Sequence, residues 1–326
     1  MPHILIAGKL HPAGLALLDT TPGVTYTHVE EISEASYQDH LEQGDGMVIR
    51  TQPMTAASVA KAARVQIVSR HGVGYDAVDV AALNARGIPL CIVGDVNSVS
   101  VAEHAMMQIL ACAKQLIRSD RAVRSGPWGW RNKLEQGEIS GKTLLIIGFG
   151  RIGRHLATMA SAFGMNILAH DPYLAAKGWP DGNVACANDL TAALAGADFV
   201  SVHIPKADKP IIGAAEIAAM KRGAIIVNTA RGGIVDEAAL CDGLRLGQIA
   251  AAALDVFDTE PPHADHPLLA FDQVILTPHT AGLTAEAAER MAVSSVQNVL
   301  DFFAGRLDPA LVVNAAALTG AKELVK

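Results

Sequence analysis

The stretch TLLIIGFGRIGRHLATMASAFG (residues 143–164) decides the fold of the second half of the chain. An apolar run typical of a buried strand leads into glycines spaced G-x-G-x-x-G, and an Ala-rich, amphipathic helical pattern follows. Gly148 permits a tight turn, Gly150 lets the backbone approach a phosphate, and Gly153 lets the helix pack closely on the strand. The amides of Arg151 and Ile152 would face the phosphates at the helix N-terminus. This order of strand, turn and helix predicts a dinucleotide-binding unit.

Similar strand and helix patterns alternate along almost the whole chain. Short β-branched runs separated by Ala-rich helical stretches are typical of parallel sheets with helices on both faces. The class that we predict is α/β, with two doubly wound parallel-sheet domains: a Rossmann domain inserted into a flavodoxin-like domain. The expected strands are 3–8, 47–50, 65–69 and 88–93 in the first half, and 143–148, 166–171, 199–204, 224–229, 250–256 and 273–277 in the second.

Two chain crossings are expected between these domains. The segment GDVNS (94–98) leads into a long helical pattern (99–124), and Ser100 with Glu103 forms a capping-box pattern near its start. A second helical pattern, 284–304, carries the chain back. The predicted domains are therefore 1–98 plus 287–326, and 99–286, with a cleft between them.

Composition and charge exclude several classes of partner. The chain has 326 residues, a formal net charge of -7 without blocks of like charge, and 50% apolar residues, so we expect neither a nucleic-acid surface nor a basic membrane patch. No apolar run reaches the roughly 18 residues that span a bilayer, and the stretch MPHILIAG at the N-terminus has no signal-peptide pattern. The four cysteines stand far apart, without metal-ligand or redox spacing. We therefore expect a cytoplasmic protein without a metal site.

An acidic residue ends the strand pattern that follows the glycine motif. Asp171, in LAHDPY, stands where a carboxylate accepts hydrogen bonds from both hydroxyls of an adenosine ribose. It would also repel a 2′-phosphate, and no arginine adjoins it in the sequence, so NAD is the cofactor that we predict in preference to NADP. The alternative is a turn residue before Pro172.

The residues that follow the other second-half strands define the rest of the predicted cofactor site. In an open parallel sheet, ligands bind outside the carboxyl ends of the strands, so these residues would face one crevice. The predicted cofactor-binding set is Gly148, Gly150, Arg151, Ile152, Gly153, Asp171, His203, Pro205, Thr229, Ala230, Arg231, Asp255, His279 and Gly282.

Three residues at the same sheet edge form a chemical set. Arg231, in NTARGGIVDE, offers a planar fork of donors that fits the carboxylate of an α-keto acid. His279, in TPHTAG, gives or takes a proton near neutral pH, and Glu260, in DVFDTEPP, would hydrogen-bond its imidazole and fix the tautomer. Asp255 would orient a nicotinamide amide or steady Arg231. The alternatives are a basic loop for Arg231, a solvated turn for Glu260 and a surface loop for His279.

With these residues in place, the chain resembles a known family, the NAD-dependent D-isomer-specific 2-hydroxyacid dehydrogenases, which include D-3-phosphoglycerate dehydrogenase and hydroxypyruvate/glyoxylate reductase. The similarity runs along almost the full chain. It is carried by SRHGVGYDAVDV (69–80), ARGIPLC (85–91), NSVSVAEHA (97–105), GKTLLIIGFGRIG (141–153), VNTARGGIVDE (227–237), ALDVFDTEPP (253–262) and HPLLAFDQVILTPHTAG (266–282).

The resemblance implies an oxidoreductase that transfers a hydride between NAD(H) and C2 of a small D-2-hydroxy or 2-keto acid, with D-3-phosphoglycerate, hydroxypyruvate and glyoxylate as candidates. Arg231 would bind the substrate, Glu260 would partner the histidine, and His279 would be the acid/base catalyst. The backbone at HGVG (71–74) would grip the substrate carboxylate, which makes 1–98 plus 287–326 the substrate-binding domain and 99–286 the NAD-binding domain. The predicted substrate-binding set is Arg50, Arg70, His71, Gly72, Val73, Gly74, Arg231 and His279.

Several features leave the substrate and the class of function open. LCIVGDVNS (90–98) stands where many relatives carry a Pro-Gly turn, and VHIPKADKPIIG (202–213) lacks the usual Leu-Thr after the proline. Arg50 and Arg70 would bind a second anionic group, such as a phosphate; the alternative is a pair of solvated strand ends. The alternative function is a non-catalytic, NAD-sensing scaffold like the corepressors of this fold, and a third hypothesis is formate or phosphite chemistry.

The resemblance also implies a homodimer. The helical pattern 99–124 and the segment GPWGW (126–130) would form its two-fold interface, since relatives associate there and two tryptophans lie close together. The alternative is that the apolar residues of these segments belong to the core.

Overall fold

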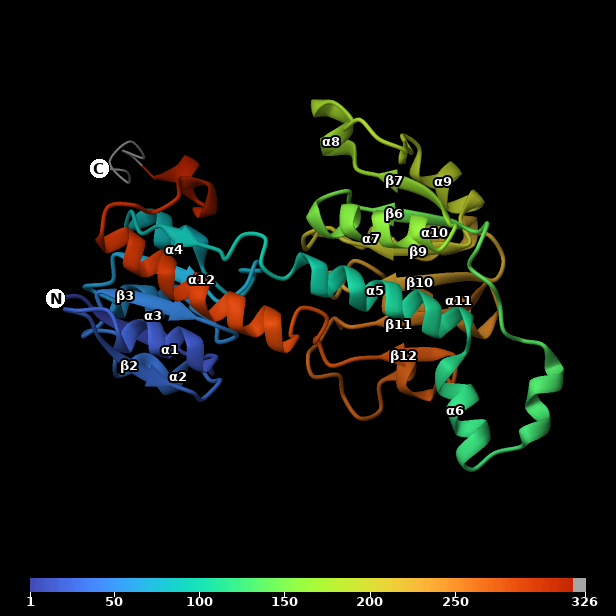
Figure 1. The fold of residues 1–326 in the computed structure, drawn as a ribbon, viewed down its shortest axis with the longest axis horizontal. Helices are drawn as coiled ribbons and strands as arrows, with labels where there is room; N and C mark the ends of the chain where they lie inside the picture. The colour runs from blue at the N-terminus through green and yellow to red at the C-terminus, as the bar shows by residue number, and fades with distance from the viewer. Residues whose placement is uncertain (319–326) are drawn as a thin grey trace. The chain divides into compact units, whose positions relative to one another are not determined.

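The computed structural model describes residues 1–318 and divides the chain into two compact units. The first unit comprises Met1–Asn97 and the chain from Leu283 onward, and the second comprises Ser98–Gly282 (Figure 1). Each unit has its own parallel sheet and its own hydrophobic cores on the two faces of that sheet. The α/β class with two parallel-sheet units is therefore confirmed.

The first unit contains a five-stranded sheet in the order β2-β1-β3-β4-β5. This order is that of flavodoxin-like folds, and all neighbouring strands run parallel. Its central strands are buried on both faces, as apolar β-branched runs in a covered sheet should be. The strands are β1 (His3–Ala7), β2 (Thr25–Val29), β3 (Gly46–Ile49), β4 (Ile67–Arg70) and β5 (Leu90–Cys91).

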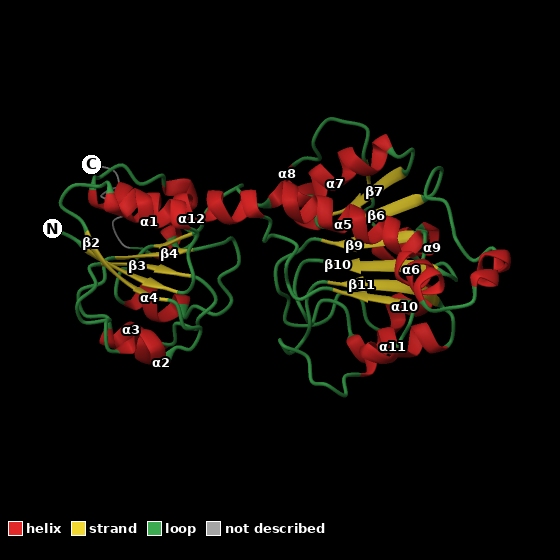
Figure 2. Ribbon diagram, turned by 60° about the horizontal axis from the view of Figure 1, so that its bottom comes forward, coloured by secondary structure: helices red, strands yellow, loops and turns green. Residues whose placement is uncertain are grey.

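Helices cover both faces of this sheet (Figure 2). One core packs α1 (Pro12–Asp19) and α12 (Ala285–Phe303) against the sheet, and α12 is the returning helix that the sequence predicts for 284–304. Thr284 caps its N-terminus by accepting a hydrogen bond from Ala287 N at 3.1 Å. The opposite core contains α2 (Ala35–Gln38), α3 (Ala56–Lys61) and α4 (Val80–Ala85), and short 3-10 turns follow α12 at η3 (Pro309–Leu311) and η4 (Ala315–Ala317).

The second unit contains a seven-stranded parallel sheet in the order β12-β11-β10-β9-β6-β7-β8. The chain adds strands outward from β6 on one side and then returns to add β9 on the other, so a topological switch point lies between β6 and β9. The strands are β6 (Thr143–Ile147), β7 (Asn166–His170), β8 (Ala185–Cys186), β9 (Phe199–Val202), β10 (Ala224–Asn228), β11 (Ile249–Leu254) and β12 (Val274–Leu276).

Helices again cover both faces of the sheet (Figure 2). Helices α5 (Ser98–Ala113) and α7 (Arg151–Ala162) pack on one face, and α9 (Leu190–Gly196), α10 (Ala214–Ala219) and α11 (Glu237–Arg245) pack on the other. The remaining elements are α6 (Leu116–Arg124), α8 (Pro172–Lys177), η1 (Trp128–Lys133) and η2 (Pro267–Ala270).

The single helix predicted for 99–124 is wrong. Helix α5 ends at Ala113 and α6 starts at Leu116, and between them Gln115 has a left-handed backbone with φ of 46°. The capping box is wrong as well, because α5 already begins at Ser98 and Ser100 lies buried inside it. Helical periodicity alone cannot reveal such a break, since the residues on both sides of it favour a helix.

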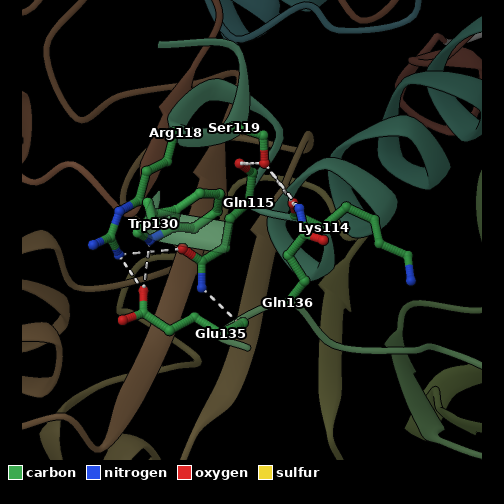
Figure 3. A network of polar contacts seen from close by, with 7 residues as sticks. All are labelled: Lys114, Gln115, Arg118, Ser119, Trp130, Glu135 and Gln136. Carbon is green, nitrogen blue, oxygen red and sulfur yellow. Dashed lines mark hydrogen bonds and ion pairs between the residues drawn. The ribbon is translucent and has the colours of Figure 1, made fainter. Parts of the chain in front are cut away.

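Polar contacts explain where the chain turns at this break (Figure 3). The Gln115 amide donates to the Glu135 carbonyl at 2.8 Å, and the Glu135 carboxylate accepts from Arg118 at 2.5 Å and from Trp130 Nε1 at 3.2 Å. Gln136 donates to the Lys114 carbonyl at 2.9 Å. The segment after α6 is thereby fastened to the end of α5.

Two short edge strands, β2 and β8, were not anticipated from the sequence. Strand β2 is exposed or half-exposed along its length and carries the polar stretch TYTHV, while β8 has only two residues. The expected strand 88–93 is likewise reduced to Leu90 and Cys91. Edge strands bury less surface, so their apolar pattern is weak.

Residues 1–318 include no helix that is both long and apolar enough to cross a membrane. All four cysteines are free thiols; Cys91, Cys112 and Cys241 are buried, and Cys186 is half-buried. Burial raises the pKa of the Cys91 and Cys112 thiols to about 12, so these side chains act as small apolar core residues.

Candidate functional site

The glycine motif forms the turn from β6 into α7 (Figure 1). Gly148 has φ of 93°, and a Cβ atom there would lie 2.5 Å from the His203 carbonyl oxygen. A Cβ atom on Gly153 would lie 2.4 Å from the Gly148 carbonyl oxygen, whereas one on Gly150 would meet no atom of the described chain within 4 Å. The outer two glycines therefore permit close packing. Gly150 leaves open space at the N-terminus of α7, where free amides attract a phosphate.

Asp171 links this turn to the end of β7. Its Oδ2 accepts a hydrogen bond from Phe149 N at 3.0 Å, and its Oδ1 caps α8 by accepting one from Leu174 N at 2.9 Å. Each carboxylate oxygen keeps a further lone pair for a ribose hydroxyl. Arg154, from α7, donates to the Phe149 carbonyl at 3.1 Å, so an arginine does approach the turn although none adjoins Asp171 in the sequence.

Two buried polar atoms at the ends of β9 and β10 lack a hydrogen-bond partner among residues 1–318. They are His203 Nδ1 and Thr229 Oγ1, and the other ring nitrogen of His203 lies 2.8 Å from Ser201 Oγ. Burial lowers the pKa of His203 to about 3, so its ring is neutral. Native proteins satisfy most buried polar atoms, and a ligand bound at this sheet edge would supply the missing partners. Pro205 is exposed in the loop that follows.

The turn that carries Arg231 is closed by the side chain of Asn228. Asn228 Oδ1 accepts from Ala230 N at 3.0 Å, and its Nδ2 donates to the Arg231 carbonyl at 2.9 Å. A Cβ atom on Gly232 would lie 1.9 Å from the Phe257 carbonyl oxygen. This close backbone approach joins the turn after β10 to the loop after β11 that carries Glu260.

Glu260 and His279 form a hydrogen-bonded pair. The Nδ1 atom of His279 lies 2.7 Å from Glu260 Oε2, and Glu260 Oε1 accepts from Phe257 N at 3.1 Å. Burial by itself would raise the pKa of Glu260, but these hydrogen bonds and the positive charges of His279 and Arg231 outweigh it, so the pKa is lowered. The influence of Arg231 on this carboxylate places its charge near the pair.

The loop after β12 holds His279 in an unusual backbone conformation. His279 has φ of 53°, which L-residues other than glycine rarely adopt. The fully buried carboxylate of Asp255 fixes this loop, because it accepts from Thr277 Oγ1 at 2.5 Å, Thr280 N at 2.9 Å and Ala281 N at 2.8 Å. Gly282 ends the loop and the second unit.

Two further side chains, which the sequence pattern did not predict as site residues, lie beneath this loop. His104 and Gln108, from α5, lie within 3.1 Å and 3.3 Å of Thr277 Oγ1. The available signal was their spacing of four residues on an otherwise apolar buried helix face, which places both side chains on the same side.

The predicted substrate-binding residues of the first unit lie at the carboxyl ends of β3 and β4. Arg50 donates to the Lys9 carbonyl at 3.3 Å, and Arg70 donates to the His71 carbonyl at 2.9 Å. His71 is 6% exposed, and burial together with the charges of the two arginines lowers its pKa to about 4. Gly72 has φ of 148°, and half-buried Val73 and Gly74 follow it.

The structure thus gathers the predicted cofactor and catalytic residues at the carboxyl edge of the seven-stranded sheet. It gathers Arg50, Arg70 and 71–74 at the corresponding edge of the five-stranded sheet. Within residues 1–318, no group of three or more His, Cys, Asp or Glu side chains has the arrangement of a metal site.

Comparison with known proteins agrees with this geometry. The D-3-phosphoglycerate dehydrogenase of Methanocaldococcus jannaschii is 36% identical over 310 residues, which cover 94% of this chain and 58% of that protein. The chain spans about half the length of the curated relatives it matches.

Solved structures match over nearly their whole length. The TT0316 protein of Thermus thermophilus has a TM-score of 0.86 and 30% identity, covering 94% of this chain and 98% of that one. An NADPH-dependent glyoxylate/hydroxypyruvate reductase of Sinorhizobium meliloti, solved with citrate, has a TM-score of 0.81 and 28% identity, covering 93% and 95%. The family model for the NAD binding domain of D-isomer specific 2-hydroxyacid dehydrogenases matches residues 106–281. The chain therefore belongs to the D-isomer specific 2-hydroxyacid dehydrogenase family.

Proposed function

We propose that this protein is an NAD-dependent dehydrogenase that transfers a hydride between NAD(H) and C2 of a small D-2-hydroxy or 2-keto acid. The observation that carries the proposal is the 2.7 Å contact between Glu260 and His279, at the same sheet edge as the glycine turn. A histidine oriented by a carboxylate is the acid/base arrangement that a carbonyl reduction needs. Arg231, whose charge acts on Glu260, adds a binding group for a carboxylate.

The residues present fit a dinucleotide. The turn from Gly148 to Gly153 would hold the pyrophosphate, and Asp171 would accept the ribose hydroxyls. His203 and Thr229, at the neighbouring strand ends, would contact the nicotinamide half, whereas the buried carboxylate of Asp255 accepts hydrogen bonds from the loop of His279. NADH, when bound, supplies the hydride. The charge of Asp171 favours NAD over NADP, since it would repel a 2′-phosphate.

The side chains of this protein then bind the substrate and move the proton. The guanidinium of Arg231 binds the substrate carboxylate through two parallel hydrogen bonds. His279 uses Nδ1 to contact Glu260, which leaves Nε2 to donate a proton to the C2 oxygen during reduction and to accept it during oxidation. In the first unit, the backbone amides at 71–74 would suit a carboxylate group.

The second substituent of the substrate distinguishes the candidates. Arg50 and Arg70 lie at adjacent strand ends and would suit a phosphate, as in D-3-phosphoglycerate; hydroxypyruvate or glyoxylate would leave them without a charged partner on the substrate. The name of the M. jannaschii relative supports the first candidate, and that of the S. meliloti reductase supports the second.

A panel of 2-keto acids tests the proposal. 3-Phosphohydroxypyruvate, hydroxypyruvate, glyoxylate and pyruvate should each be assayed with NADH and with NADPH by the loss of absorbance of the reduced cofactor. We expect reduction with NADH, and a D-configured product on chiral analysis. Tight NADH binding without turnover of any acid would contradict the proposal and favour the NAD-sensing scaffold. Turnover of formate or phosphite alone would favour the third hypothesis.

We also propose a cytoplasmic homodimer. Helix α6 has no buried residue, Trp128 is 64% exposed, and Leu116 and Ile117 line a cavity of about 470 Å³ beside the helix. Apolar surface of this kind is typical of interfaces. Light scattering coupled to gel filtration should give twice the monomer mass, and Trp128→Asp should reduce it. A monomeric wild-type protein would contradict the dimer. Fractionation of the source cells would test the proposed cytoplasmic location.

A further inference from the structure

We propose that His104 is a positioning residue for His279: through Thr277 and Asp255 it fixes the loop that holds His279 in its left-handed conformation. The proposal rests on the proposed function, in which His279 exchanges a proton with the substrate. All the residues concerned lie within the second unit, Ser98–Gly282.

A continuous chain of contacts runs from α5 to the loop. His104 Nε2 lies 3.1 Å from Thr277 Oγ1, and Thr277 Oγ1 lies 2.5 Å from Asp255 Oδ1. The Asp255 carboxylate then accepts from the amides of Thr280 and Ala281. Thr277 precedes His279 by two residues and Thr280 follows it directly, so this chain of contacts binds the backbone on both sides of the histidine.

The proton count fixes the direction of these hydrogen bonds. The carboxylate of Asp255 can only accept, so the single hydroxyl proton of Thr277 points to it. The Thr277 oxygen is then an acceptor, and the donors facing it are His104 Nε2 at 3.1 Å and Gln108 Nε2 at 3.3 Å. Burial lowers the pKa of His104 more than the nearby Asp255 raises it, so a neutral ring that carries its proton on Nε2 fits this position.

Gln108 completes the arrangement. As placed, its Nε2 lies 3.1 Å from His104 Nε2, and its Oε1 is buried without a partner among residues 1–318. The same Nε2 atom lies 3.3 Å from Thr277 Oγ1, so Gln108 contacts both the ring of His104 and the bridging hydroxyl.

Burial of Asp255 and His104 makes this chain of contacts important for the position of the loop. Asp255 is 0% exposed, and the side chain of His104 is 15% exposed, at 3.7 Å from Asp255 Oδ1. A charged group without solvent depends on each of its hydrogen bonds, so weakening the Thr277 contact should also weaken the contacts to Thr280 and Ala281. By contrast, the side chain of His279 is 50% exposed, and its own packing does not fix the loop.

His104→Ala and His104→Gln test the proposal. Alanine removes the donor, whereas the glutamine amide can place an N–H near the position of Nε2. Glu103→Ala is the control, because Glu103 is exposed on the same helix and outside the contact chain. Two measurements should be made for each variant: steady-state kinetics, giving kcat and KM for the best keto acid, and amide hydrogen exchange of Thr280 and Ala281 by NMR.

For His104→Ala we expect kcat to fall roughly 10- to 100-fold with little change in KM, because a misplaced catalytic group slows the chemical step. The two amides should exchange at least about tenfold faster, since each loses a stable acceptor. His104→Gln should restore most of both values, and Glu103→Ala should match the wild type. Unchanged exchange and kcat in His104→Ala would overturn the proposal.

Thr277→Val provides a second test if His104→Ala does not fold. It removes the bridging hydroxyl with little change in size, and it should raise the exchange of the same two amides; wild-type exchange would overturn the proposal. The exchange measurement also separates this proposal from the proposed function. If the wild type reduced no keto acid while His104→Ala still released the amides, the proposed function would fail and the role of His104 in holding the loop would stand.

Discussion

The Nδ1 atom of His279 lies 2.7 Å from Glu260 Oε2, although the two residues are 19 positions apart and follow different strands. Two backbone features make this contact possible. The Gly232 turn packs against the Phe257 carbonyl and sets the loop of Glu260, and the buried Asp255 sets the loop of His279. The side chains of the pair are half-exposed, so their own packing does not hold them in place. The two anchored loops therefore determine the distance between them.

His279→Gln should lower turnover by roughly 10²- to 10⁴-fold, the usual contribution of a general acid or base. The amide keeps much of the size and polarity of the ring but cannot exchange a proton near neutral pH. NADH affinity, measured by fluorescence titration, should change little because the glycine turn and Asp171 are intact. Glu260→Gln should cause a smaller loss, since an amide oxygen still accepts the Nδ1–H. Wild-type turnover in His279→Gln would remove the assigned role.

Gly232→Ala should damage catalysis more than cofactor binding. The new Cβ would lie 1.9 Å from the Phe257 carbonyl oxygen, so the turn of Arg231 and the loop of Glu260 must separate. We expect a loss of about 1–3 kcal/mol in the free energy of unfolding, typical of overpacking, and a clear fall in kcat. Gly196→Ala is the matched control, because no atom of the described chain lies within 4 Å of its Cβ position. Equal kcat in the two variants would show that catalysis does not depend on the close approach of Gly232 to the Phe257 carbonyl.

The sequence predicts well those parts of the fold that bury apolar strands on both faces. β6 and β10 coincide with their predicted runs to within one residue, because fully buried strands need continuous β-branched sequence. The prediction failed at Gln115, where the turn depends on Glu135, twenty residues away. Helix propensity depends on neighbouring residues only, so it cannot predict a turn that is stabilised by a residue twenty positions away.

The site, like the fold, has residues that the local sequence predicts and residues that depend on contacts with distant parts of the chain. Arg231, Glu260 and His279 could be proposed from the sequence because each follows a strand and carries a reactive group. His104 could not, because a histidine within an apolar helix reads as a core residue until its partner, Thr277, is placed beside it. A residue that we propose to orient another side chain is therefore harder to find from sequence than the side chain that it orients.

Asp171→Asn should weaken the preference for NADH over NADPH. The amide oxygen can still cap α8, but the amide nitrogen cannot accept from Phe149 N, so the change removes both the negative charge near the adenosine ribose and one contact to the glycine turn. We expect the ratio of kcat/KM for NADH over NADPH to fall by about 10- to 100-fold, equivalent to roughly 1.4–2.8 kcal/mol. Asp189→Asn is the control, since Asp189 caps α9 in the same way by accepting from Ala192 N at 3.1 Å. A similar ratio for Asp171→Asn and the wild type would show that the carboxylate does not select the cofactor.

His203 should make the cofactor-free protein less stable in mild acid. Its pKa is about 3 in the folded protein because the ring is buried, against an ordinary value of 6.5, so the unfolded chain takes up the proton first. The stability contributed by the neutral ring is complete above pH 6.5 and is lost as the pH falls toward 3, by up to ~1.4 kcal/mol per pH unit. His203→Gln keeps a polar partner for Ser201 Oγ and cannot take up a proton in this range. Urea unfolding at pH 7, 6 and 5 should show a shallower pH dependence for the variant than for the wild type. Parallel curves would mean that the ring of His203 reaches solvent and is protonated in the folded protein.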